Sequence, residues 1–201
     1  MTLSNQQVID RLGSHFVAAW GNIKGKKDYA GSSNTHLPSH AAKEVTNCAG
    51  HHNVQMVFLT SSGRVLHCLP GFWNAQHFLH EMDLAITLGK LYYTQGLSSA
   101  ERNHEYLNLH LRHALDHSVA LRYKSHHQGF DKKNLEKRES SDFHRTEGFI
   151  ASGLKTPDQV LHERLAERPF LPFESFDVKR FIDMGRKKYK YDYGIKKKGK
   201  T

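Results

Sequence analysis

Long apolar runs, cysteines and signal-like segments are all scarce in this chain of 201 residues. No apolar stretch approaches the roughly 20 residues that a membrane-spanning helix needs. Met1 to Gln7 carry neither the basic nor the apolar part of a secretory signal. The two cysteines are too few for a disulfide framework. We therefore expect a soluble chain, cytoplasmic by default, although the compartment stays unknown and an exported mature chain remains an alternative.

Familiar catalytic motifs are also missing. The segment Gly21 to Lys27 lacks the spacing of a phosphate-binding Walker loop, and no serine lies in a nucleophile-elbow setting. The histidine-rich segments contain no His-Glu-x-x-His spacing of a zinc hydrolase. These absences favour a protein that is not an enzyme, without deciding the question.

Negative charge is in the minority. The chain has 29 Lys and Arg against 20 Asp and Glu, a net charge of +9, and its 16 histidines add positive charge in acid. A positive surface favours acidic partners. We expect a protein partner or a homo-oligomer with an acidic surface; nucleic acid is possible but less favoured.

The N-terminal half begins with short helical and strand patterns. Ser4 to Gln7 fit a capping box, which predicts a helix that Gly13 ends. Residues 15–20 then predict a strand, and residues 38–45 a second short helix.

A hairpin followed by a helix is the clearest pattern. Residues 54–59 form an apolar run that predicts a strand, residues 61–63 a turn, and residues 64–69 the returning strand. Asn74 then caps a helix whose apolar positions recur at helical spacing. Those positions are Phe78, Leu79, Met82, Ala85, Ile86 and Leu88.

This order of helix, strand, helix, hairpin and closing helix resembles the C-terminal portion of a thioredoxin-like domain, over about residues 4–93. The elements that precede this portion in the family are absent before Ser4, and so is the Cys-x-x-Cys. Gln55 stands where the family has a cis-proline. The resemblance implies an α/β fold with an incomplete, redox-inactive thioredoxin-like sheet and a β-hairpin.

The C-terminal half predicts helical and extended structure. Ser98 to Glu101 fit a capping box that opens a helix reaching about Tyr123. Thr156 to Gln159 open another helix, which Pro169 ends, and residues 177–188 predict a last one. We expect a thioredoxin-like α/β domain over residues 1–95 and a helical extension with a basic tail over residues 96–201.

Histidines form a stripe on the predicted helix that begins near Ser98. His110, His113 and His117 are spaced at i, i+3 and i+7, beside the apolar face. Imidazoles at such spacing bind transition metals or haem iron. The alternative is a set of ordinary histidines at the boundary between the core and solvent. The sequence leaves both interpretations open.

Aromatic and basic side chains near the C-terminus are the candidate partner-binding residues. The Pro- and Phe-containing stretch over residues 168–176 should be extended, and it either packs on its own domain or docks on another chain. The tail after Gly185 mixes cations with tyrosines, which suits an acidic protein surface or single-stranded nucleic acid. The candidates are Arg168, Phe170, Phe173, Phe176, Arg186, Lys187, Lys188, Tyr189, Tyr191 and Tyr193.

Three functions follow as hypotheses. The first is a non-catalytic interaction subunit, an accessory, assembly or scaffold protein of a larger complex that needs no cofactor. The second is a metal- or haem-binding protein built on the histidine stripe. The third is a thiol-disulfide oxidoreductase through Cys48 or Cys68, which requires a thiol of lowered pKa.

Overall fold

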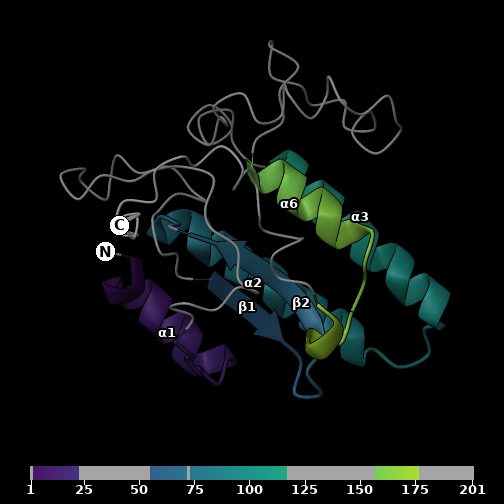
Figure 1. The fold of residues 1–201 in the computed structure, drawn as a ribbon, viewed down its shortest axis with the longest axis horizontal. Coiled ribbons are helices and arrows are strands. Elements are labelled where there is room, and N and C mark those ends of the chain that lie inside the picture. The colour runs from purple at the N-terminus through teal and green to yellow at the C-terminus, as the bar shows by residue number, and fades with distance from the viewer. Residues whose placement is uncertain (1, 23–54, 72, 117–156, 177–201) are drawn as a thin grey trace, which may run out of the picture.

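Helices and one small antiparallel sheet make up the part of the chain that the computed structural model describes, residues 2–22, 55–71, 73–116 and 157–176. A mixed α and β architecture is thus confirmed. Figure 1 shows the hairpin over α2, with α1 on one side and the α3–α6 pair on the other. No described helix is long and apolar enough to cross a membrane. The elements are η1 (Thr2–Ser4), α1 (Gln6–His15), β1 (Gln55–Leu59), β2 (Val65–Pro70), α2 (Ala75–Tyr93), α3 (Ser99–Asp116), α6 (Pro157–Ala166) and η3 (Phe173–Ser175).

The first helix departs from the prediction at both ends. Asn5, not Ser4, is its N-cap, because the Asn5 side chain accepts a hydrogen bond from the backbone N–H of Val8 at 3.3 Å. The helix continues through Gly13 to His15. The predicted strand over residues 15–20 is wrong: residues 16–20 are irregular. Strand formation needs a partner edge to satisfy the backbone, and in the described sheet β1 pairs with β2 alone.

The predicted hairpin is confirmed. β1 and β2 pair antiparallel, with Phe58 opposite His67, and Gly63 adopts a φ of 74° in the turn. A C-terminal segment covers part of the other edge of β2: the N–H of Val65 donates to the carbonyl of Leu171 at 2.8 Å.

The segment over residues 168–176 is less extended than predicted. Pro172 pairs with Arg64 in an isolated bridge, but the next residues form the short helix η3. The expectation that the whole stretch is extended was therefore wrong for residues 173–175. Pro172 precedes the first turn of η3, where its missing N–H removes no intrahelical hydrogen bond.

The two long helices begin where the sequence predicted. Asn74 caps α2 by accepting a hydrogen bond from the N–H of His77 at 3.0 Å. The capping box before α3 is complete: Ser98 accepts from the N–H of Glu101 at 3.2 Å, and its own N–H donates to the Glu101 carboxylate at 2.8 Å. The predicted helices over residues 38–45 and 177–188 lie outside the described residues.

One hydrophobic core joins the hairpin to the four α-helices of the described residues. Its largest fully buried side chains come from β2, from the loop before α2 and from the helices, and include Leu69, Trp73, Phe78, Tyr106 and Leu161. Histidine and glutamate side chains lie inside the same core. They are His67, Glu81, His110, His113 and His162.

Candidate metal centre

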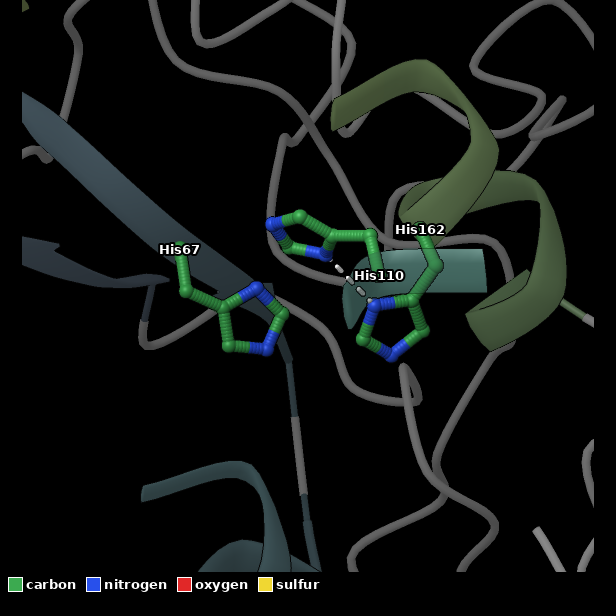
Figure 2. A group of neighbouring side chains, drawn as sticks. All are labelled: His67, His110 and His162. Carbon is green, nitrogen blue, oxygen red and sulfur yellow. Dashed lines mark hydrogen bonds between the residues drawn. The ribbon is translucent and has the colours of Figure 1, made fainter. Parts of the chain in front are cut away.

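Three histidines from three different elements meet in the core. His67 lies on β2, His110 on α3 and His162 on α6, and the side chains of all three are completely buried. Each offers one ring nitrogen, and these nitrogens lie within 4.8 Å of one another. Figure 2 shows the three rings facing a shared space, with the His110–His162 contact drawn as a dashed line. We call these three residues the inner triad.

Helical spacing places the α3 and α6 members in the core. On α3, His110 follows Tyr106 by four positions and precedes Ala114 by four, so all three lie on one buried face. On α6, His162 lies between the fully buried Leu161 and Leu165. The two faces meet because α6 packs along α3.

The buried carboxylate of Glu81 lies beside the inner triad. Its Oε2 is 2.7 Å from Nε2 of His67 and 3.4 Å from Nε2 of His162. An ionised carboxylate can only accept hydrogen bonds. Glu81 therefore favours the tautomers of His67 and His162 that carry the proton on Nε2, and their Nδ1 atoms then carry lone pairs.

A backbone carbonyl has the same effect on His110. The carbonyl oxygen of Leu66 lies 3.4 Å from Nε2 of His110 and also accepts the hydroxyl of Tyr106 at 3.0 Å. With its proton on Nε2, His110 presents the lone pair of Nδ1 toward Nδ1 of His162, 3.0 Å away. Lone pairs that converge in this way can coordinate a cation.

Burial lowers the pKa of two members of the triad. The pKa of His110 lies well below its ordinary value because the ring is desolvated, and the neighbouring His162 and His67 lower it further. Desolvation also lowers the pKa of His162 to about 3, although Glu81 acts in the opposite direction. Both rings are therefore neutral at pH 7, and neutral imidazole is the form that binds metal ions.

A second group of possible ligands adjoins the first. His80, Glu81 and His113 each offer one ligand atom, and these atoms also lie within 4.8 Å of one another. Nε2 of His113 is 3.1 Å from Oε1 of Glu81, and the ring of His80 stacks on that of His113 with centroids 4.2 Å apart. We call these three residues the outer group, because His80 is exposed while the inner triad is not.

The predicted histidine stripe is divided between these groups. His110 belongs to the inner triad and His113 to the outer group, whereas His117 lies outside the described residues. His110 is 0 % exposed and His113 is 8 % exposed, so both lie deeper than the expected boundary with solvent.

Sequence reasoning missed three buried residues of the site: His67, Glu81 and His162. A signal for each was present. His67 interrupts an apolar strand, Glu81 falls three positions after Phe78 on the apolar face of α2, and His162 follows Leu161 inside a short helix. A polar residue at a core position needs a hydrogen-bonding partner. The sequence did not show that His67 and His162 both find that partner in Glu81.

The remaining candidate residues lie elsewhere. Phe170 and Phe176 are buried in the chain's own core and Phe173 packs against it, which favours the intrachain alternative for this segment. Cys68 is a buried free thiol whose pKa is raised by desolvation. Other candidates lie outside the described residues: Cys48, Arg186, Lys187, Lys188, Tyr189, Tyr191 and Tyr193.

Comparison of the chain with protein-family models, with curated proteins and with solved structures gives no match. The geometry of the buried histidines and Glu81 is therefore what indicates a function for this chain.

Proposed function

We propose that this protein binds a first-row transition-metal ion, of the class that includes Zn²⁺, through the inner triad. The observation that carries the proposal is the convergence of three fully buried histidines, His67, His110 and His162, on one space in the core. Imidazole nitrogen is a ligand that Zn, Cu, Fe and Ni share.

The spacing of the ring nitrogens supports an ion between them. Two nitrogens bound tetrahedrally to one Zn²⁺ at about 2.0–2.1 Å lie roughly 3.3 Å apart. The Nδ1 atoms of His110 and His162 are 3.0 Å apart, close to that value. A water or another small ligand would complete the coordination of an ion held by three protein nitrogens.

The surroundings of the triad also support this function. Metal-binding histidines usually donate their second ring N–H to a carboxylate or a backbone carbonyl, which fixes the tautomer and orients the ring. Glu81 is placed to accept from His67 and His162, and the carbonyl of Leu66 to accept from His110. The competing arrangement is a metal-free hydrogen-bonded network, in which the two close Nδ1 atoms share a single proton.

Metal analysis of the full chain, expressed without a histidine tag, tests the proposal. The purified protein should retain about one tightly bound ion after dialysis against a weak chelator. His162→Gln should lose it, because an amide of similar size cannot replace imidazole as a ligand. His104→Ala removes an exposed histidine of the same helix pair and should retain the ion.

Two further results would decide between the arrangements. Glu81→Gln should weaken the affinity of the inner triad by roughly 10–100-fold, as loss of a carboxylate behind metal-binding histidines does. A wild-type chain that takes up no ion after chelator treatment and reconstitution with Zn²⁺, Co²⁺, Ni²⁺ or Fe²⁺ would refute the proposal. Far-UV circular dichroism of each variant would show that the helices remain folded.

A further inference from the structure

The outer group has the composition and geometry of a second ion site. His80 and Glu81 are neighbours on α2, and His113 faces them from α3. Two imidazoles and a carboxylate within 4.8 Å of one another are a donor set that divalent transition metals accept. The 3.1 Å between Nε2 of His113 and Oε1 of Glu81 is close to the spacing of roughly 3.3 Å between two ligands of one ion.

We propose that the outer group binds a second divalent transition-metal ion through His80, His113 and Oε1 of Glu81. This inference rests on the proposed function, because the same carboxylate supports the inner triad. The two oxygens of Glu81 have different neighbours: Oε2 lies near His67 and His162, whereas Oε1 lies near His113. One carboxylate therefore serves the inner ion as a hydrogen-bond acceptor and the outer ion as a ligand.

The two sites differ in their access to water. Every member of the inner triad is 0 % exposed, whereas His80 is exposed and His113 is 8 % exposed. Water can therefore fill the remaining positions around the outer ion, and that ion exchanges with solvent more readily than the inner one. A coordination sphere with open, water-filled positions is the arrangement that metal-assisted hydrolysis uses, whereas a closed one serves structure.

Charge should also make the affinity of the outer group for an ion lower than that of the inner triad. Glu81 is the single carboxylate in the two groups, so the first divalent ion already outweighs its negative charge. A second ion nearby meets residual positive charge and binds more weakly. It also draws electron density from the carboxylate that accepts hydrogen bonds from His67 and His162. Occupancy of the outer site should therefore weaken the inner one, and by linkage the inner ion should weaken the outer one.

Equilibrium dialysis of the chelator-treated full chain against Zn²⁺, with the bound metal counted by mass spectrometry, tests the proposal. Wild type should bind two ions, one tight and one weaker. His80→Ala should bind only the tight ion, and because His80 is exposed the variant should fold normally. His104→Ala, which removes an exposed histidine outside both groups, should still bind two. His162→Gln should lose the tight ion and keep the weaker one.

The outcomes separate the two proposals. No bound ion in wild type refutes the proposed function and this inference together. One tight ion that His80→Ala leaves unchanged refutes only the outer site. A second ion that survives in His80→Ala, or that disappears in His104→Ala, is held by other surface side chains and refutes the outer site as well.

Discussion

Glu81 carries a carboxylate at a position of α2 where helix periodicity predicts an apolar side chain. It shares the buried face of α2 with Phe78, Met82 and Ala85, and it is 0 % exposed. Removing an ionised carboxylate from water costs several kcal/mol unless charge and hydrogen bonds compensate. His110 and His162 are neutral at pH 7, so these two rings do not supply the balancing positive charge. A divalent ion in the inner triad would supply it.

Cys68 lies next to His67 on β2 and provides a prediction about a single residue. Its thiol is completely buried, and desolvation raises its pKa. The thiolate is the reactive form, so native Cys68 should resist iodoacetamide at pH 8 while the urea-unfolded chain is labelled fully. Mass spectrometry of a Cys48→Ser variant isolates the signal of Cys68. Labelling of the native protein as fast as the unfolded one would contradict the burial and restore the thiol-disulfide hypothesis for this residue.

At the scale of elements, the four segments that carry the site are β2, α2, α3 and α6. A different local or tertiary interaction positions each of them. β2 is held by the hairpin and α2 by its Asn74 cap, while α3 begins at the Ser98–Glu101 capping box. Packing along α3 positions α6. Local sequence signals therefore set three elements, and tertiary contact sets the fourth.

The Asn74 cap provides a prediction for an element. Asn74→Ala should lower the free energy of unfolding by about 1 kcal/mol, because the N–H of His77 loses its acceptor. Urea unfolding should show this loss as a lower midpoint concentration, while the slope of the unfolding free energy against urea concentration stays unchanged. Gln76→Ala, an exposed change in the first turn of the same helix, should shift stability far less. Equal effects of the two changes would mean that the cap contributes nothing to the stability of α2.

At the scale of the whole molecule, the site couples segments far apart in sequence. His110 and His162 touch although 52 positions separate them, and His67 and Glu81 join the hairpin to α2. An ion bound at such a site stabilises the folded state, because the unfolded chain has no preformed site. The interaction-subunit hypothesis stays a prediction because the basic tail lies outside the described residues. The thioredoxin-like resemblance also stays a prediction, because none of the comparisons gives a match.

The stability of the metal-free chain should depend on pH. His110 and His162 have lowered pKa values in the folded state, so below about pH 6.5 the unfolded chain takes up protons that the folded chain does not. Acid therefore destabilises the fold, by at most roughly 1.4 kcal/mol per pH unit for each of the two histidines. The stability is fully present above pH 6.5 and is lost progressively toward the folded-state pKa values.

Urea unfolding of the chelator-treated chain between pH 7.5 and 5 would measure this slope. His162→Gln should reduce it, and His104→Ala, which removes an exposed histidine of the same helix pair, is the matched control. A stability that does not change over this range would mean that the buried rings take up protons in the native state as readily as in the unfolded chain, and the lowered pKa values of His110 and His162 would be wrong.

The elements with strong local signals were predictable. The hairpin, the Asn74 cap and the Ser98 capping box match the structure because each depends on residues within a few positions of one another. The strand predicted over residues 15–20 failed because Val17 and Trp20, which favour strands, are 100 % and 92 % exposed and have no neighbouring strand among the described residues.

The sequence by itself determined the helical faces and strand runs on which His67, Glu81, His110 and His162 lie, because spacing along a helix or a strand decides which side chains share a face. Only the tertiary structure decided that these faces meet in one place. The approach of α6 to α3, and of both to β2, depends on packing between segments tens of residues apart. No local pattern encodes that packing, so α3 supplies one histidine to each group, and two other helices and a strand supply the remaining residues.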